Sequence, residues 1–328
     1  MPVPIQAGTV LRDRYQVKKI IGQGGMGCIY LAEDLRLEGR LCAVKEVEYD
    51  YALPEEMLKQ ARDQFQREAT VLARLDHPNL PKVSDFFSTG DRDYLVMDFV
   101  AGKDLRQLMM EARQNGTFLA EEDVLDWARQ LADALKYLHN QENPILHRDI
   151  KPSNLKLTPN GLVKLVDFGL VKMLAPGEVT ITILQGQGTA LYTPLEQYGG
   201  DSGHTDARSD IYAFGGTLYH LLTNEPPLNV RDRFLNPGSL PKVRELNPEI
   251  SLRTERAIHW ALQLHPEDRP KDIDTFLNAL FVEDAPITKP FRASQIRPRV
   301  VRKAEKILIF IAGSLILVSF LLTLIRNF

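Results

Sequence analysis

The spacing of apolar residues changes near Gly102, and this change constrains the fold more than any other feature of the chain. Before Gly102, strand-like patterns occupy residues 15–21, 28–33, 41–47, 82–88 and 94–99, and one helical stretch follows Pro54. After it, apolar residues three and four apart predict helices over residues 104–114, 121–139, 209–222 and 255–264, with short strands at 155–157 and 163–166. We therefore predict an α+β fold with a small β-rich lobe followed by a larger helical lobe.

Charge is distributed unevenly along the chain. The 328 residues carry a formal charge of -3 and are 44% hydrophobic and 25% charged, as in ordinary globular proteins. Residues 283–328 hold eight Lys/Arg against three Asp/Glu, so the preceding part is clearly acidic. A basic, nucleic-acid-binding body is therefore not expected.

The basic segment precedes a stretch without any charge, residues 307–325. As a helix these residues would rise about 28 Å, close to the thickness of a bilayer core. A buried core helix is the alternative, but the stretch has no polar face. Basic residues lie before it at Arg297, Arg299, Arg302, Lys303 and Lys306, and only Arg326 follows. We expect a single-pass helix in the cell membrane and its lipid bilayer, with everything before it cytoplasmic and the short tail, residues 326–328, at the opposite face.

Two cysteines, Cys28 and Cys42, lie in predicted strands. Disulfides are rare in a cytoplasmic compartment, so we expect both to be small buried or half-buried apolar residues.

A glycine-rich turn joins the first two predicted strands. Glycines let a backbone approach phosphate groups closely; here the turn comprises Gly22, Gln23, Gly24, Gly25, Met26 and Gly27. A dinucleotide fold would need a helix next, and the residues that follow are strand-like instead. A merely flexible hairpin remains the alternative.

Lys45 lies in the next strand, within Ala43-Val44-Lys45. A lysine beneath a phosphate-covering loop can neutralise phosphate charge, and Glu68 on the following helix can hold its ammonium group. An exposed surface lysine is the alternative.

The segment from His147 to Asn154 carries the strongest chemical signal. Asp149 can orient a hydroxyl nucleophile, Lys151 can balance charge on a transferred phosphoryl group, and Asn154 can bind a metal ion through oxygen. Asp167, in Asp167-Phe168-Gly169, follows a strand and offers a second oxygen ligand.

In this order and spacing, the motifs over residues 15–282 resemble those of the eukaryotic-like (Hanks-type) Ser/Thr protein kinases of bacteria. The resemblance implies a bilobal kinase domain, with residues 15–100 as N-lobe and hinge and 101–282 as C-lobe. Residues 283–306 form the basic juxtamembrane linker. The resemblance also implies that ATP binds between the lobes and that Asp149 is the catalytic base. By the same resemblance, Lys45 pairs with Glu68, and Asn154 and Asp167 bind Mg²⁺, with Mn²⁺ as an alternative ion.

The same resemblance assigns the adenine site. Met97 matches the gatekeeper, and the backbones of Asp98 and Val100 are expected to hydrogen-bond adenine, with Ile29 and Ala43 as further nucleotide contacts. Asp104 matches a position that often contacts ribose or substrate, although a helix N-cap explains it equally well.

Two carboxylates are expected to be architectural. Glu196 ends the activation segment in Pro194-Leu195-Glu196, where the family usually reads Ala-Pro-Glu, and it is expected to pair with Arg269. Asp210 is expected to cap backbone groups near the catalytic loop.

Lys151 and Thr189 favour Ser/Thr over Tyr as phosphoryl acceptor, by the same resemblance. Thr180 and Thr182 lie between Asp167 and Glu196, where a phosphate could pair with Arg148 and order the loop. An exposed, unmodified loop is the alternative.

We therefore expect a membrane-anchored protein kinase that transfers the ATP γ-phosphoryl group to protein Ser/Thr and phosphorylates its own activation loop, with a homodimer as a further expectation. The alternatives are a pseudokinase acting as a membrane-tethered nucleotide-binding scaffold and a small-molecule phosphotransferase. All five residues needed for phosphoryl transfer are present, which argues against the pseudokinase: Lys45, Glu68, Asp149, Asn154 and Asp167. Thr189, Glu196 and Arg269 argue for a protein substrate.

Overall fold

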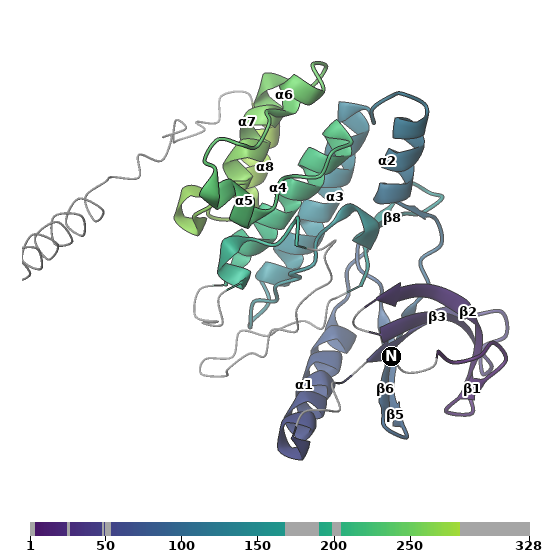
Figure 1. Ribbon diagram of the computed structural model, residues 1–328. Helices are drawn as coiled ribbons and strands as arrows, with labels where there is room; N and C mark the ends of the chain where they lie inside the picture. Colours follow the sequence, from purple (N-terminus) through teal and green to yellow (C-terminus); the bar gives the residue numbers. More distant parts are fainter. Residues whose placement is uncertain are drawn as a thin grey trace, which may run out of the picture. The chain divides into compact units, whose positions relative to one another are not determined.

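The computed structural model describes residues 4–24, 27–47, 49, 54–167, 190–198 and 205–282. The chain divides into two units, residues 1–288 and 289–328, and every described residue belongs to the first. That unit has a β-rich N-terminal lobe and a helical C-terminal lobe (Figure 1). The predicted α+β, two-lobe architecture is confirmed.

The N-terminal lobe is built on one antiparallel sheet of six strands in the order β1-β2-β3-β4-β6-β5. The strands are β1 Val10–Leu11, β2 Tyr15–Gly24, β3 Gly27–Asp34, β4 Leu41–Val47, β5 Val83–Thr89 and β6 Arg92–Asp98. Five of them were predicted within three residues at each end. The two-residue β1 was not, because so short a strand has no measurable alternation.

Different groups of side chains pack on the two faces of this sheet. β3 alternates half-buried and buried positions, and its buried side chains, with Tyr15 and Phe87, form an apolar cluster on one face. The opposite face packs with helix α1, Glu55–Arg74, which contributes Phe65 and Leu72 to the main core. β4 is buried along almost its whole length because both of its faces are covered. Cys28 and Cys42 are both free and buried in the sheet, as predicted.

The C-terminal lobe is a bundle around one buried helix. Its helices are α2 Leu105–Gln114, α3 Glu121–His139, α4 Ala207–Thr223, α5 Val230–Leu235, α6 Val243–Leu246, α7 Leu252–Ala261 and α8 Ile273–Phe281. α4 is buried over nearly every residue. It approaches α7 so closely that a Cβ on Gly215 would lie 2.7 Å from the Cβ of Ala261. The sequence pattern missed α5, α6 and α8.

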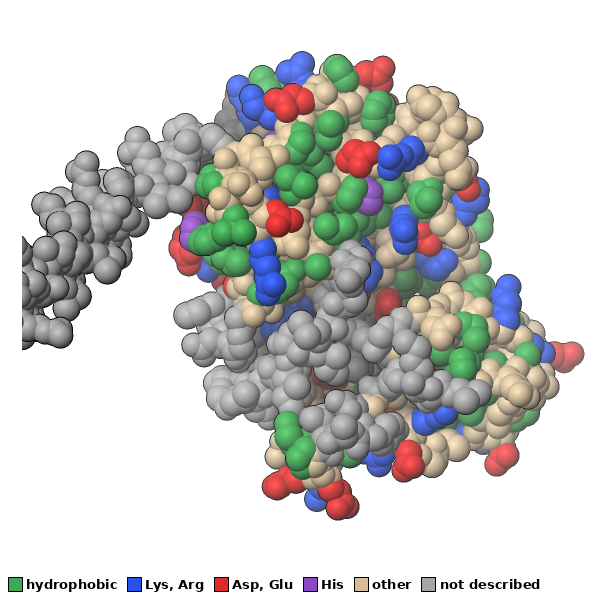
Figure 2. Space-filling view, in the orientation of Figure 1, with side chains coloured by type: hydrophobic (Ala, Val, Ile, Leu, Met, Phe, Trp, Pro, Cys, Tyr) green, Lys and Arg blue, Asp and Glu red, His purple; other side chains and the backbone are tan. Residues whose placement is uncertain are grey.

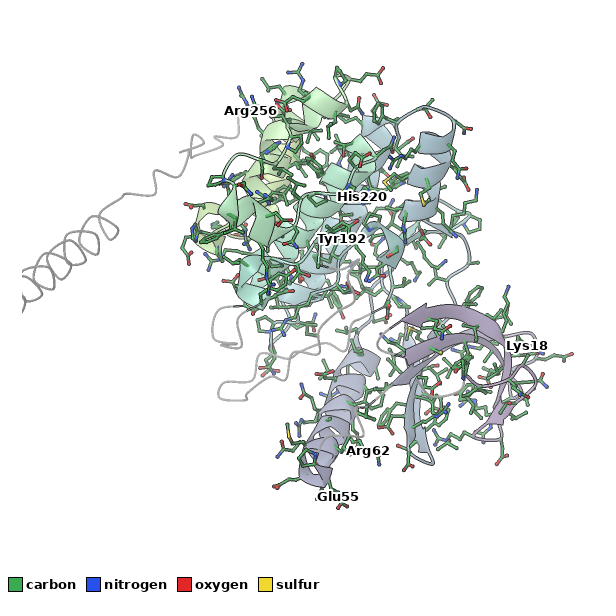
Figure 3. The ribbon with its side chains drawn as sticks, in the orientation of Figure 1. Lys18, Glu55, Arg62, Tyr192, His220 and Arg256 are labelled. Carbon is green, nitrogen blue, oxygen red and sulfur yellow. The ribbon has the colours of Figure 1, made fainter. Side chains whose placement is uncertain are left out.

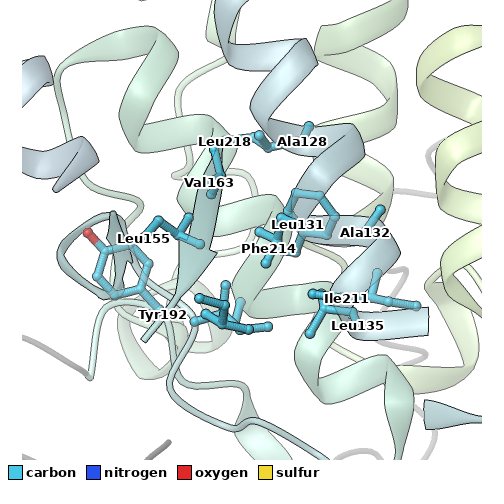
Figure 4. Close-up of a cluster of buried hydrophobic side chains, with 14 of the residues drawn as sticks. Ala128, Leu131, Ala132, Leu135, Leu155, Val163, Tyr192, Ile211, Phe214 and Leu218 are labelled. Atoms are coloured by element: carbon cyan, nitrogen blue, oxygen red, sulfur yellow. The ribbon is translucent and has the colours of Figure 1, made fainter. Parts of the chain in front are cut away.

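A small sheet, β7-β8-β9, lies where the lobes join. Its strands are β7 Lys103–Asp104, β8 Leu155–Leu157 and β9 Val163–Leu165. Leu155 and Val163 from this sheet face a cluster formed by α3 and α4, in which Leu131 and Phe214 are central (Figure 4). The loop between α3 and β8 is therefore fixed at both ends by the core.

Among the described residues, no helix is long and apolar enough to cross a bilayer. The predicted span, residues 307–325, and the basic linker before it lie outside the described part. On the face shown in Figure 2, Lys/Arg and Asp/Glu side chains are interspersed over both lobes.

Candidate active site

A carboxylate of α4 holds the loop that carries Asp149. Asp210 is fully buried and accepts hydrogen bonds from the N–H groups of His147 (2.9 Å) and Arg148 (2.8 Å). Nε2 of His139 lies 2.9 Å from the same carboxylate. Burial raises the pKa of Asp210, but the hydrogen bond and charge of His139, with further help from His147 and the Arg148 N–H, outweigh burial and leave the pKa below its ordinary value. The predicted capping role of Asp210 is confirmed.

Asp149 is fixed by two neighbours on its own loop. The amine of Lys151 lies 2.9 Å from its carboxylate oxygens. The amide of Asn154 donates to Oδ2 at 2.9 Å and to the backbone carbonyl of Asp149 at 2.8 Å. The structure thus brings together two of the predicted catalytic residues, Asp149 and Lys151, and one predicted metal ligand, Asn154. This arrangement gives Asp149 one orientation and places a cation beside it before any substrate binds.

Lys45 and Asp167 join the two lobes at this site. The amine of Lys45, on β4, forms an ion pair and a hydrogen bond with Asp167 Oδ1, and the two residues are 122 apart in the chain. Burial alone raises the pKa of Asp167, but the charge and hydrogen bond of Lys45 and the charge of Lys151 outweigh it, so the pKa is lowered. Asp167 adopts a left-handed φ of 59°, a conformation that is rare for a non-glycine residue.

Glu68 lies on the buried face of α1, with 4% of its surface exposed. Its Oε1 accepts a hydrogen bond of 2.9 Å from Gln64, one turn earlier. Its predicted pairing with Lys45 stays a prediction.

Asn154 and Asp167 form a donor set that suits a hard divalent ion. Because the Asn154 amide nitrogen is used by Asp149, its oxygen is left with one weak contact, Ser153 Oγ at 3.5 Å. The Asp167 side chain is 32% exposed. Within the described residues, no three His, Cys, Asp or Glu side chains cluster around a metal position. The pair therefore fits a hard divalent ion whose remaining oxygen ligands would come from outside these two side chains.

The glycine-rich turn is a strand–turn–strand, as predicted. Gly22 pairs with Ile29 and Gly24 with Gly27 across β2 and β3, and Gly27 has a φ of 114° that favours glycine. Gln23 pairs with Cys28, whereas Gly25 and Met26 lie outside the described residues. A helix does not follow, which removes the dinucleotide-fold alternative.

The predicted adenine residues lie at the joint between the lobes. Ala43 pairs with Met97 across β4 and β6, and both are buried, as is Val100. The N–H of Asp98 donates to the Lys82 carbonyl at 2.9 Å. The N–H of Asp98 is therefore already bonded within the protein, and the predicted hydrogen bond of this residue to adenine stays a prediction for its carbonyl.

Asp104 is an N-cap. Its carboxylate accepts from the Gln107 N–H at 2.9 Å, and the Gln107 side chain accepts from the Asp104 N–H at 3.0 Å. This capping box at the start of α2 confirms the structural alternative. The ribose or substrate contact stays a prediction.

The predicted pair of Glu196 and Arg269 is confirmed and nearly solvent-free. Arg269 Nη1 and Nη2 donate to the two carboxylate oxygens at 2.6 and 3.0 Å, and Ser209 Oγ adds a third bond at 2.7 Å. The side chains are 0% and 8% exposed for Arg269 and Glu196. Leu195 begins a short 3-10 turn, Leu195–Gln197, so the family's usual proline is not needed here for a turn.

Three activation-segment predictions, for Thr180, Thr182 and Thr189, lie outside the described residues. Arg148, the predicted partner of a phosphate on Thr180 or Thr182, has a left-handed φ of 61° and a buried Nε with no hydrogen-bond partner in the described part of the chain. Burial lowers the pKa of this guanidinium despite the charges of Asp210 and Glu68. A desolvated, underused guanidinium is a suitable receptor for an added anion.

Sequence reasoning missed three groups. His139 adds a third hydrogen bond to the Asp210 carboxylate. The side-chain amide of Asn79 donates to the Val163 carbonyl at 2.7 Å, and the backbone carbonyl of Asn79 accepts from the Leu165 N–H. His220 lies 2.5 Å from the hydroxyl of Tyr192. Each is a lone polar residue on a helix or loop, and its partner is far away in the chain.

Comparison with known proteins agrees with this geometry. The sequence model of the protein kinase domain matches residues 15–282. The serine/threonine-protein kinase PrkC of Bacillus subtilis is 33% identical over 287 residues, 83% of this chain and 42% of that protein. The serine/threonine-protein kinase PknB of Mycobacterium leprae is 34% identical over 270 residues, 79% of this chain and 41% of that protein.

The chain thus spans about two fifths of the length of these curated relatives. The crystal structure of the Mycobacterium tuberculosis PknI kinase domain superposes with a TM-score of 0.64 at 28% identity and covers 84% of this chain and 98% of that one. A match over most of the chain, with the ion pairs of Lys45 with Asp167 and of Lys151 with Asp149 in place, means that the chain belongs to the protein kinase family.

Proposed function

We propose that this chain is a Ser/Thr protein kinase that transfers the γ-phosphoryl group of ATP to hydroxyl groups of protein substrates. The observation that carries the proposal is the meeting of Lys45 and Asp167 from the two lobes, beside the cluster of Asp149, Lys151 and Asn154. A pseudokinase would have no need to keep all of these groups in hydrogen-bonded positions.

Each residue has a role that its contacts support. Asp149 is held with its carboxylate ready to orient a Ser/Thr hydroxyl and accept its proton, and Lys151 beside it balances charge that develops on the transferred group. Lys45 neutralises phosphate oxygens beneath the glycine-rich hairpin. Asn154 and Asp167 would hold Mg²⁺, which when bound neutralises phosphate charge.

The test compares variants of the full chain incubated with Mg-ATP and protein or peptide substrates. Asp149→Asn and Lys45→Met are expected to lower the rate by at least about 100-fold, with folding retained. Matched controls are Asp76→Asn and Lys271→Met, whose side chains are 84% and 80% exposed. Unchanged phosphate incorporation by Asp149→Asn would end the catalytic assignment.

We also propose that the activation segment phosphorylates itself at Thr180 or Thr182. The buried Nε of Arg148, which has no hydrogen-bond partner among the residues that the structure describes, supports this, because a phosphate would give it charge-assisted hydrogen bonds. Mass spectrometry of wild type and Asp149→Asn after incubation with Mg-ATP tests it. Phosphate on these threonines in wild type alone is the expected result, and its absence from both residues in active wild type contradicts the proposal.

Membrane anchoring through residues 307–325 is a further part of the proposal, supported by the uncharged span and the basic residues before it. Deletion of residues 304–328 should move the protein to the soluble fraction. Replacing Arg302, Lys303 and Lys306 with Gln should keep the protein in the membrane but weaken its preference for anionic lipid, by about 1 kcal/mol per residue. Continued membrane attachment after the deletion contradicts the anchor.

A further inference from the structure

Tyr192 and His220 form a polar pair at the edge of the helical core. The Tyr192 hydroxyl lies 2.5 Å from His220 Nδ1, and the two rings stack with centroids 6.1 Å apart. Figure 3 shows the two side chains side by side, and Figure 4 shows the Tyr192 ring beside Leu155 of β8. Tyr192 is 7% exposed, whereas His220 is half-buried. The pair is therefore anchored in the core on one side and reaches solvent on the other.

The hydrogen bond fixes the tautomer of His220. Burial raises the pKa of Tyr192, so its hydroxyl keeps its proton. This buried hydroxyl has no other acceptor among the described residues, so it donates to Nδ1 rather than accepting a proton from it. Burial, with the charges of Arg106 and Arg113, lowers the pKa of His220 to about 4, so the ring is neutral at physiological pH. The remaining ring proton is then on Nε2, which has no partner among the described residues. His220 presents a fixed N–H donor.

Two arginines of α2 make the surroundings of this donor positive. Arg106 and Arg113 are seven residues apart and so lie on one face of the helix, with the exposed Met110 between them. Arg113 donates to the Asn224 carbonyl at 3.0 Å and to Glu225 at 2.9 Å. Arg106 is exposed and has no carboxylate partner in the described part of the chain. Its charge is therefore free to attract an anion.

This surface adjoins the catalytic loop. α2 packs against the 3-10 turn Pro152–Asn154, which contains one of the proposed metal ligands, and it also packs against α4, which carries His220. Tyr192 belongs to the segment just before Glu196. These contacts place α2 and α4 beside the loop that carries Asp149.

We propose that Arg106 and His220 form a subsite for an Asp or Glu side chain of the protein substrate, a few residues from the phosphorylated Ser/Thr. The proposal rests on the proposed function. Its basis is charge complementarity: a carboxylate would accept a hydrogen bond from His220 Nε2 and give Arg106 its missing counter-ion. Tyr192 acts as a positioning residue, because its hydroxyl holds the imidazole in the donor tautomer.

The test uses the full chain, Mg-ATP and peptides with one central Ser/Thr and Ala, Asp, Glu, phosphoserine, Lys or Arg at each flanking position. For wild type we expect one position at which Asp and Glu raise kcat/KM about three- to tenfold over Ala, mainly through KM. Arg106→Glu is expected to reverse the order at that position in favour of Lys and Arg. Tyr192→Phe is expected to weaken the acidic preference without reversing it.

Arg256→Glu is the matched control, because Arg256 is exposed on α7, far from Tyr192 and His220 in Figure 3. It should leave every flanking preference unchanged. A reversal of preference at one position separates recognition from a structural effect, which would lower all rates alike.

Three results overturn the subsite. These are wild type with no acidic preference, a preference for phosphoserine alone, or Arg106→Glu with the wild-type preference. Phosphorylation of peptides without any charge preference would overturn the subsite but leave the proposed function intact. Failure of wild type to phosphorylate any peptide or protein would overturn both.

Discussion

Replacing Arg269 with alanine should be among the most damaging single changes in the C-terminal lobe. All five N–H groups of this guanidinium have acceptors: the two Glu196 oxygens and the carbonyls of Arg208, Gln263 and Leu264, at 2.6–3.1 Å. Truncation leaves the Glu196 carboxylate, 8% exposed, with the Ser209 hydroxyl as its only remaining donor among the described residues. Removing one partner of a buried ion pair costs about 3–5 kcal/mol, because the remaining charge is desolvated and unpaired.

For a domain of this size, that loss corresponds to a fall in Tm of roughly 6–20 °C, which thermal unfolding followed by circular dichroism measures directly. Arg269→Lys keeps the charge but loses the forked geometry, so an intermediate fall is expected. Arg256→Ala, at an exposed position, should change the free energy of unfolding by less than about 0.5 kcal/mol. If Arg269→Ala melts within about 2 °C of wild type, the assumption that the pair is dry and strongly coupled is wrong.

Three further predictions use other residues. Because the pKa of Asp210 is lower in the folded protein than its ordinary value of 3.8, ionised Asp210 stabilises the fold above pH 3.8. This stabilisation is lost as the pH falls through the pKa of the folded protein. In urea unfolding, the free energy of unfolding should therefore depend less on acid pH for Asp210→Asn than for wild type. Asp104→Ala removes the N-cap of α2 and should cost about 1 kcal/mol of unfolding free energy, while an unchanged KM for ATP would argue against the ribose contact. Gly102→Ala, whose Cβ would lie 2.1 Å from the Leu157 carbonyl oxygen, should lower Tm far more than Gly116→Ala, which also has a positive φ but meets nothing within 4 Å; equal shifts would contradict this reading.

The parts of the fold that could be predicted from sequence are those with long, regular patterns. The helix at residues 121–139 was predicted to the residue because its apolar positions repeat over five turns. α5 and α6 are six and four residues long, too short for a period to be recognised. α8 does have buried apolar residues at helical spacing, Ile273, Phe276 and Leu280, and Asp272 as N-cap, so the sequence carried a signal for this helix, although only over nine residues.

The residues of the candidate site also divide into those that local spacing predicted and those that it did not. Asp149, Lys151, Asn154 and Asp167 are close in the chain, so their spacing alone indicated shared chemistry. His139 and His220 were missed because their partners, Asp210 and Tyr192, come from other elements, and a single histidine on a helix has no pattern. Spatial convergence of this kind is set by packing between helices, which local periodicity does not encode.

The attachment of the catalytic loop to Asp210 has a consequence for how this protein could be switched. Moving the catalytic loop away from α4 would leave the buried Asp210 carboxylate and the N–H groups of His147 and Arg148 without these hydrogen bonds. Each buried group left unsatisfied costs about 1–3 kcal/mol. The loop that carries Asp149, the proposed proton acceptor, is therefore expected to keep its position. The link of Lys45 to Asp167 between the lobes is a more accessible point of control, because the Asp167 side chain is 32% exposed and the ion pair aligns the proposed phosphate-binding lysine with a proposed metal ligand.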